Sequence, residues 1–290
     1  SDAEIKSIAA EQEFYAPELP VAGGELFDGA YHRAHLQELE EVRELLADEK
    51  SRQVFDSVIE YKLSGRIDPL LSCQTPEEEN WQLLFESSAG QGGRRPENAT
   101  EEMPGDEKVF LDLGAYTGDT VELFLKLSGG HYSKIIAAEP EARNFRKLTE
   151  TAVRLFGTDP GGCLPGRIRL VNAAVGDSNG AALFTHGVGR GGAEGKGKTR
   201  PVEQLTVDSI LAGEAADIIK MDIEGAESAA IRGAEQTIRV FRPRMLISAY
   251  HRCEDLFAIP LQVLKIRPDY RVLLRKDPCL PAWGINCFFI

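Results

Sequence analysis

The chain has 290 residues, of which 42% are hydrophobic and 27% are charged, and its formal net charge is −13. This length and apolar content predict a globular protein with a sizeable core. The acidic balance argues against nucleic acid as a partner, because binding to a polyanion draws on clustered Lys and Arg.

The first hundred residues predict helices that stand apart from the strand-rich remainder. Residues 31–46 are rich in Leu, Glu and Arg, which favours a helix. Ser51 is the expected N-cap of a second helix, and Gly65 its expected end. One apolar stripe on this helix must pack against another element, and it consists of Val54, Phe55, Val58 and Ile59.

A linker is expected between these helices and the rest of the chain. Residues 90–98 are rich in Gly and polar side chains, and an acidic stretch follows as far as Asp106. We therefore predict an N-terminal helical extension and linker over residues 1–105 and a second domain over residues 106–290.

Residues 109–120 combine an apolar strand, a glycine turn and the start of a helix, which is how an α/β sheet holds a nucleotide-like cofactor. The dinucleotide pattern G-x-G-x-x-G needs a second glycine where this chain has Tyr116. Asp112 and Asp119 also flank the turn. Their carboxylates would repel a pyrophosphate and attract the ammonium and sulfonium groups of S-adenosylmethionine, so the turn favours this cofactor over NAD.

Two further strands end in residues suited to the same cofactor. The strand over residues 133–138 leads into Glu139 and Pro140, and a carboxylate there can accept both ribose hydroxyl protons in NAD enzymes and in methyltransferases alike. The strand over residues 167–175 contains Asn172 and Ala173, which suit an adenine edge and a flat ring.

A phosphate-loop pattern at residues 192–199 needs a separate interpretation. It matches G-x-x-x-x-G-K-[ST], but a phosphate loop requires a strand before it and a helix after it. Here a glycine-rich run precedes the pattern, and Pro201 would interrupt a helix. We interpret residues 187–200 as a mobile loop between two strands, not as a nucleotide site.

Three polar residues that follow apolar strands are the expected acceptor side of the site. Asp222 and Glu224 come after one strand and His251 after the next, so all three should converge near the methyl group of the cofactor. His251 has the pKa range of a general base. Asp222 and Glu224 are two residues apart, so both could face one side of an extended strand end.

Other roles for these residues stay open at this point. The two carboxylates could hold acceptor hydroxyls, orient His251, or bind a divalent metal, which would be Mg²⁺ or Ca²⁺ rather than zinc; we favour a site without metal. Asp112 could cap its own turn, Glu224 and Glu227 could stabilise a helix N-terminus, and His251 could be a surface residue.

The spacing of strands predicts the sheet. Strands near residues 109, 134, 167, 216 and 244 alternate with helical stretches, which indicates a mostly parallel sheet. Residues 270–274 and 284–290 lack a helix between them, so they should pair antiparallel.

Composition also bears on the compartment. The sequence has no apolar run near the length of a membrane span and no signal-peptide core at its start, so we expect a cytoplasmic protein without a membrane partner. Five cysteines without a C-x-x-C spacing fit a reducing compartment and predict neither a disulfide framework nor a zinc site.

The sequence resembles the FkbM-type S-adenosylmethionine-dependent methyltransferases from about Val109 to the C-terminus. The resemblance rests on residues 112–120, 139–140, 220–227 and 249–251, and residues 46–65 resemble a helical extension of some bacterial members. It implies a Rossmann-like class I methyltransferase fold, α/β, with a mostly parallel seven-stranded sheet and one antiparallel strand. It also implies methyl transfer, usually to an oxygen of a sugar or secondary metabolite.

We therefore expect an S-adenosylmethionine-dependent O-methyltransferase with a small-molecule or glycan acceptor. An NAD-dependent oxidoreductase using the same sheet and Glu139, and a non-catalytic binding module that keeps the fold, are the alternatives. The expected catalytic residues are His251, Asp222 and Glu224. The expected cofactor-binding residues are Asp112, Gly114, Ala115, Tyr116, Gly118, Asp119, Thr120, Glu139, Pro140, Asn172, Ala173 and Asp222.

Overall fold

The structure is a computed structural model that describes residues 26–85, 108–185, 199–279 and 283–290. The predicted domain boundary at residue 105 and most of the predicted loop 187–200 lie outside these residues. Among the described residues, no helix is long and apolar enough to cross a membrane.

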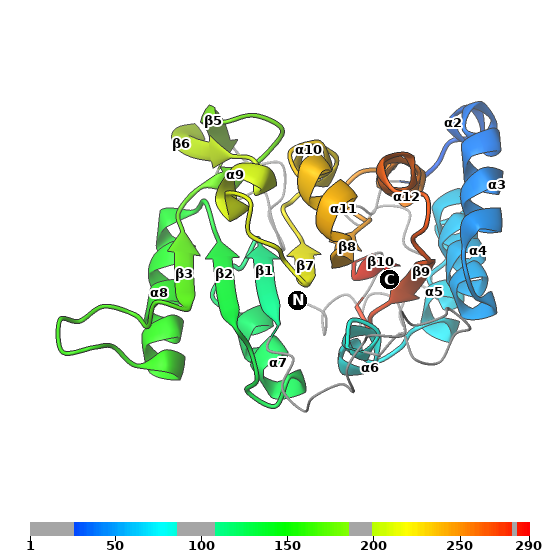
Figure 1. The fold of residues 1–290 in the computed structure, drawn as a ribbon. Coiled ribbons are helices and arrows are strands. Elements are labelled where there is room, and N and C mark those ends of the chain that lie inside the picture. The colour runs from blue at the N-terminus through cyan, green and yellow to red at the C-terminus, as the bar shows by residue number, and fades with distance from the viewer. Residues whose placement is uncertain (1–25, 86–107, 186–198, 280–282) are drawn as a thin grey trace, which may run out of the picture.

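A seven-stranded sheet lies at the centre of the molecule, in the order β3-β2-β1-β7-β8-β10-β9 (Figure 1). All neighbouring strands pair in parallel except β10, which runs antiparallel to both β8 and β9. The predicted sheet with one reversed strand is confirmed. Its strands are β1 (Val109–Leu113), β2 (Lys134–Ala138), β3 (Ile168–Val171), β7 (Ile218–Met221), β8 (Arg244–Ser248), β9 (Val272–Lys276) and β10 (Ile285–Phe289).

Helices cover both faces of this sheet, because successive strand residues point to opposite sides. Phe110 of β1 packs with one set of helices and Leu111 with the other. The first face is covered by α6 (Glu77–Gln82), α7 (Asp119–Leu127) and α8 (Ala142–Phe156). The second is covered by α9 (Val207–Leu211), α10 (Glu227–Arg232), α11 (Glu235–Phe241) and α12 (Asp255–Ile266).

A second, three-stranded sheet was not predicted. It consists of β4 (Ala174–Val175), β5 (Gly180–Thr185) and β6 (Thr199–Leu205), in the order β4-β6-β5. The predicted single strand over residues 167–175 is therefore wrong, because the chain leaves the main sheet after Val171. A strand, β6, follows the phosphate-loop pattern at the place where a nucleotide site would need a helix.

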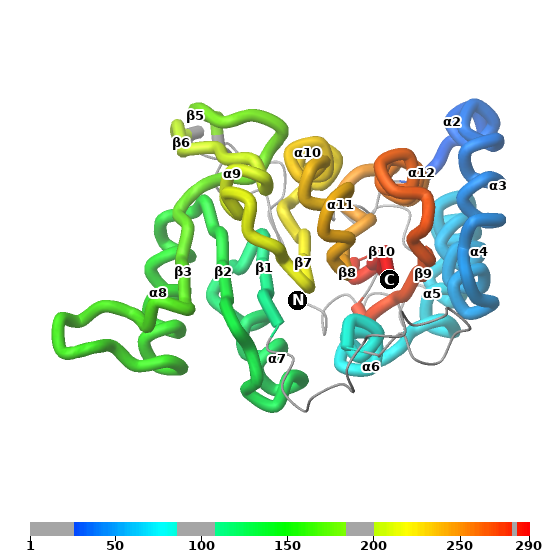
Figure 2. The backbone as a smooth tube through the Cα atoms, viewed as in Figure 1, coloured from blue at the N-terminus to red at the C-terminus, as the bar shows by residue number. Residues whose placement is uncertain are grey.

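The N-terminal helices lie against the β9 edge of the main sheet (Figure 2). Leu46 and Gln74 form isolated parallel bridges with Val272 and Lys276, so this segment continues the sheet beyond β9. Val54 belongs to the same hydrophobic cluster as the sheet. The helices are α2 (Gly29–Ala34), α3 (Leu36–Leu45), α4 (Glu49–Ser64) and α5 (Asp68–Ser72), and the predicted helix over residues 31–46 is divided between the first two.

The cap of α4 differs from the expectation. Asp48, not Ser51, is the N-cap, since its side chain accepts a hydrogen bond from the Ser51 amide at 2.7 Å. Ser51 lies in the first turn, where its hydroxyl accepts from the Leu274 amide of β9 at 3.0 Å. Gly65 ends the helix as predicted, in the left-handed conformation with φ 75°.

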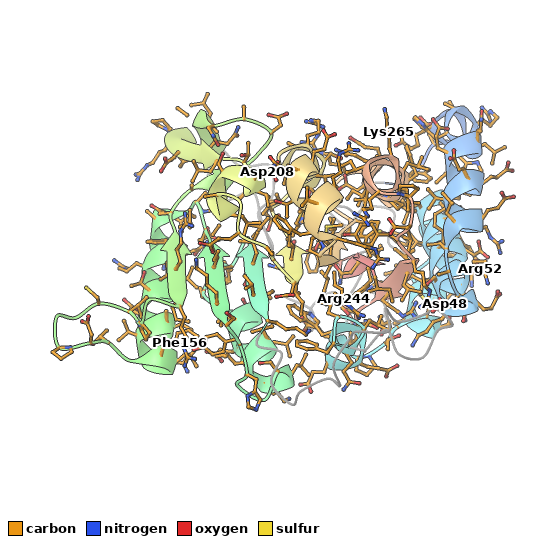
Figure 3. The ribbon with its side chains drawn as sticks, viewed as in Figure 1. Asp48, Arg52, Phe156, Asp208, Arg244 and Lys265 are labelled. Atoms are coloured by element: carbon orange, nitrogen blue, oxygen red, sulfur yellow. The ribbon has the colours of Figure 1, made fainter. Side chains whose placement is uncertain are left out.

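Asp48 also joins the helix to the sheet. Figure 3 shows Asp48 at the end of α4 next to β9, where Arg275 Nη2 donates to Asp48 Oδ2 at 2.7 Å. Burial raises the pKa of Asp48, but the hydrogen bonds from Arg275 and Ser51 outweigh it and lower that pKa to about 2. One carboxylate therefore caps α4 and neutralises a buried guanidinium.

We expect Asp48→Ala to lower the free energy of unfolding by about 1–2 kcal/mol or more, because it removes a helix cap and leaves a buried arginine unpaired. Asp56→Ala on the same helix is the matched control, since its ion pair with Arg43 is half exposed and worth at most about 1 kcal/mol. Urea unfolding of both variants measures the difference. Equal losses would contradict this role for Asp48.

Candidate active site

The site is built where the strand order of the main sheet reverses, between β1 and β7. Ligands of open α/β sheets bind at such a point, outside the carboxyl ends of the strands. Gly114 follows β1 with φ 81°, and a Cβ at this position would lie 1.9 Å from the carbonyl oxygen of Asp222. The turn after β1 and the loop after β7 are therefore in direct contact, and this contact requires glycine.

The turn after β1 is also tied to the end of β2. The amides of Gly114 and Ala115 both donate to the carbonyl oxygen of Ala138 at 3.0 Å. Tyr116 has a left-handed backbone with φ 47° and a side chain that is 46% exposed. Gly118, with φ 94°, is the N-cap of α7. An exposed aromatic ring thus stands at the position where a dinucleotide fold carries its second glycine.

A buried ion pair lies beneath this turn. Lys220 Nζ lies 3.3 Å from Asp112 Oδ1 and donates to the Gly114 carbonyl oxygen at 2.9 Å. Thr120 donates its hydroxyl hydrogen to Asp112 Oδ2. Burial lowers the pKa of Lys220, but the Asp112, Asp222 and Asp119 carboxylates outweigh it, so the pKa of the ammonium is raised. Asp112 is completely buried, which favours support of the turn over direct contact with a cofactor.

Lys220 is a site residue that the sequence expectations did not include. Its signal in the sequence is a lysine within the otherwise apolar strand β7, where every residue is buried. A buried cation in a strand interior needs a charged partner, and the aspartate of the neighbouring strand is the natural candidate.

Glu139 lies at the end of β2 with both oxygens held by the backbone. Its Oε2 accepts from the Tyr116 amide at 3.1 Å and its Oε1 from the Glu141 amide at 2.9 Å. Burial raises the pKa of this carboxyl group, although these hydrogen bonds oppose the shift. The Asn144 side chain is a third hydrogen-bond partner, and since an ionised carboxylate has about four lone-pair sites, Glu139 can still accept a further hydroxyl proton.

The remaining residues expected at the cofactor lie around Glu139 or on α7. The side chain of Asn172 donates to the carbonyl oxygen of Glu139 at 2.8 Å and so fixes the end of β2. From the sequence, Asn172 was expected only as a residue beside the adenine. Pro140 is half-buried, Ala173 is buried, and Asp119 is exposed at the start of α7.

The expected acceptor residues do come together. His251 Nε2 lies 3.4 Å from Asp222 Oδ1 and 3.4 Å from Glu224 Oε2. The extended strand end that we expected to align Asp222 and Glu224 is wrong, since β7 ends at Met221 and Glu224 has a left-handed backbone with φ 57°. A tight turn, not an extended strand, brings both carboxylates to the ring. The surface alternative for His251 is also wrong, because its side chain is 5% exposed.

Two residues outside the expected set complete this cluster. Glu227 is completely buried, and its Oε1 lies 2.9 Å from His251 Nδ1. The same oxygen accepts from the Ile223 amide at 2.8 Å. The Tyr250 hydroxyl donates to Asp222 Oδ1 at 3.0 Å. Glu227 begins α10, as the helix N-terminus alternative supposed, but its contact with His251 depends on the fold and could not be predicted from neighbouring residues.

The cluster is strongly negative around a single imidazole. Burial lowers the pKa of His251, but the hydrogen bond to Glu227 and the surrounding negative charges outweigh it and raise that pKa to about 9. Burial and the charge of Glu227 raise the pKa of Asp255, at the start of α12, to about 7. His251 is therefore an imidazolium at neutral pH before any ligand binds.

The same side chains could hold a cation. Donor atoms of Asp222, Glu227 and His251 all lie within 4.8 Å of one another. Oxygen and imidazole donors of this kind suit a divalent cation. The contact between Glu227 and Nδ1 of His251 also has an explanation that needs no metal, because it can hold the imidazole ring in place.

Comparison with known proteins identifies the family. The model of the FkbM methyltransferase domain matches residues 112–266, which is more than half of the chain and includes every residue of the cluster. A search of curated proteins found no match.

One solved structure has a similar fold. The crystal structure of methyltransferase FkbM from Methylobacillus flagellatus KT has 24% sequence identity and a TM-score of 0.71, over 90% of this chain and 60% of that chain. The chain thus spans 60% of the length of that protein. An rRNA methylase from Streptococcus thermophilus has 12% identity and a TM-score of 0.40, over 64% of this chain and 87% of that chain.

The main sheet with its one reversed strand, the helices on both faces and the N-terminal helical region together form a class I methyltransferase fold with an N-terminal helical extension. The domain match covers the turn after β1 and the cluster around His251. The chain belongs to the FkbM methyltransferase family.

Proposed function

We propose that the protein is an S-adenosylmethionine-dependent methyltransferase that methylates a hydroxyl group of a small-molecule or glycan acceptor. The contact between Gly114 and Asp222 is the observation that carries this proposal. This contact brings two parts of the site together. One is the turn after β1, which suits the cofactor, and the other is the cluster that contains a potential base, His251. Methyl donor and acceptor would then meet at one edge of the sheet.

The cofactor would lie across the ends of β1 and β2. Glu139 would accept a hydrogen bond from a ribose hydroxyl, and the turn formed by residues 114–120 would face the methionine part. Asp112 and Lys220 would hold this turn from below. Asn172, Pro140 and Ala173 would shape the adenine side.

A nicotinamide cofactor fits this turn less well. A pyrophosphate needs close approach of the backbone at the second glycine, where Tyr116 stands, and Asp119 would repel its charge. The family match concerns methyltransferases, so we set the oxidoreductase alternative aside.

His251 would act as the general base. When bound, S-adenosylmethionine supplies a methyl group on a positively charged sulfur. The acceptor oxygen forms a bond to this methyl carbon, the carbon–sulfur bond breaks, and its electron pair stays on sulfur as a thioether. His251 Nε2 takes the proton from the acceptor hydroxyl, while Asp222 and Glu224 hold the acceptor in line.

We expect the purified protein to bind S-adenosylmethionine and S-adenosylhomocysteine, and Glu139→Ala to weaken both by about tenfold or more, since a lost hydrogen bond to a charged group costs about 1.5–3 kcal/mol. Titration calorimetry measures both affinities. Glu150→Ala, exposed on α8, is the matched control. Saturable binding of NAD or ATP in place of these ligands would refute the proposed cofactor.

We expect His251→Asn to lower kcat by about 10²- to 10⁴-fold, the usual contribution of a general base. In the wild type, kcat/KM should rise with pH and level off at or below about pH 9, because the base must lose its proton and the bound sulfonium opposes protonation. Glu227, Asp222 and Glu224 face the ring, and their charges keep this midpoint above the ordinary histidine range. Asp255 also interacts with His251 electrostatically.

These rates can be measured as transfer of a labelled methyl group to a panel of hydroxylated sugars and aromatic alcohols. His131→Asn, on an exposed loop, is the control and should retain the wild-type profile. A profile that does not change with pH in the wild type would rule out His251 as the base. Cofactor binding without transfer to any member of the panel would favour the non-catalytic alternative.

We expect chelation with EDTA to leave methyl transfer unchanged, since the proposed base needs Nε2 of His251 for the proton. The same labelled assay, with Mg²⁺ and Mn²⁺ added back, measures this. Loss of activity on chelation and its recovery with either ion would contradict the proposed base. It would indicate instead a metal bound by Asp222, Glu227 and His251.

A further inference from the structure

The side chain of Glu227 connects two loops of the site. One oxygen atom, Oε1, accepts from the Ile223 amide at 2.8 Å and lies 2.9 Å from His251 Nδ1. Ile223 belongs to the loop after β7 and His251 to the loop after β8. Because Glu227 is completely buried, water does not compete for these contacts.

The two nitrogens of the His251 ring have different surroundings. Nδ1 lies at the distance of a strong charge-assisted hydrogen bond from Glu227, about 2.7–2.9 Å. Nε2 lies 3.4 Å from both Asp222 and Glu224, which is beyond that range. The Tyr250 hydroxyl already donates to the Asp222 oxygen that faces Nε2. Glu227 Oε1 is thus the carboxylate oxygen nearest to either nitrogen of the ring.

We propose that Glu227 is the positioning residue of the site: it holds the proton on Nδ1 of His251 and leaves Nε2 as the nitrogen that faces the acceptor. This inference rests on the proposed function. Glu227 touches neither cofactor nor acceptor in this arrangement and acts through the imidazole. The partner of one ring nitrogen decides which tautomer a neutral histidine adopts.

The surroundings of Glu227 support this assignment. Asp255 lies close enough for the charge of Glu227 to raise its pKa, and its Oδ2 accepts from the Arg252 amide at 2.8 Å. Asp255 thereby fixes the chain directly after His251. Two buried carboxylates, each at the start of a helix, thus lie near the histidine, and Glu227 is the one in contact with the ring.

The alternative is a purely structural carboxylate that closes the loop over residues 222–226. Such a role requires the hydrogen bond from Ile223 but gives no reason for the short contact with Nδ1. Glu227→Gln separates the two roles, because the amide keeps the shape and an acceptor oxygen but removes the charge.

The test reads the ring nitrogens of His251 directly by ¹⁵N NMR, with the resonances assigned by comparison with His251→Asn and with S-adenosylhomocysteine as the bound probe. In the wild type we expect the Nδ1–H tautomer once the ring is neutral. In Glu227→Gln we expect the pKa of His251 to fall by about 1–3 units, the usual effect of losing an adjacent charge, and Nε2–H to become populated. S-adenosylhomocysteine affinity should stay at the wild-type value.

Glu235→Gln is the matched control, since this glutamate is exposed on α11 and pairs only with Arg239 among the described residues. An Nε2–H tautomer in the wild type, which needs no substitution to detect, would overturn the inference. An unchanged titration of His251 in Glu227→Gln would overturn it as well. Neither readout depends on methyl transfer, so a failure of the proposed function is recognised separately, by absent cofactor binding.

Discussion

The close approach of Gly114 to the carbonyl oxygen of Asp222 determines how near the two halves of the site can lie. A Cβ at residue 114 would lie 1.9 Å from that oxygen, so any other residue would force the loop after β7 away from the turn after β1. A displacement of a catalytic group by about 1 Å can already lower the rate about a hundredfold. The position of Asp222 relative to the turn therefore depends on one missing methyl group.

Charge at this junction is arranged around Asp222. On one side, the Lys220 ammonium pairs with Asp112 and holds the Gly114 carbonyl. On the other side, the His251 imidazolium faces Glu224 and Glu227. Buried charges are stable only where they are paired. Each of the two cations therefore depends on the carboxylates around it, and these carboxylates depend on the cation. A sulfonium bound between them would add a third positive charge to a negative pocket, which favours its binding.

The parts of the fold that the sequence predicted are those with local signals. Alternating strands and helices, the missing helix before β10 and the glycine turn at Gly114 each follow from a few neighbouring residues. The errors arose where long-range contacts decide. β4 leaves the main sheet and pairs with β6, which lies far along the sequence. The cap of α4 is an exception, since Asp48 contacts Ser51 only three residues away, while the Ser51 hydroxyl accepts from β9.

The candidate site was predictable to the same extent. The residues at strand ends could be expected to converge, and Asp222, Glu224 and His251 do. The geometry could not be foreseen, since it depends on a left-handed backbone at Glu224, a conformation that non-glycine residues adopt only where the fold enforces it. Glu227 and Tyr250 lie in the segments that carry the family resemblance, but their contacts with His251 and Asp222 could not be foreseen, because a buried contact between two loops leaves no periodic pattern.

The N-terminal helices lie at the sheet edge and also contact the helix that follows His251. The Tyr31 ring lies tilted against His35, and His35 stacks on Phe257 of α12, with ring centroids 4.5 and 4.9 Å apart. Helix α12 begins at Asp255, four residues after His251 along the chain. Because α3 packs on α12 and α4 is anchored to β9 through Asp48, the extension restrains the helix that follows the histidine loop. The extension is therefore packed against the helix that directly follows the histidine loop.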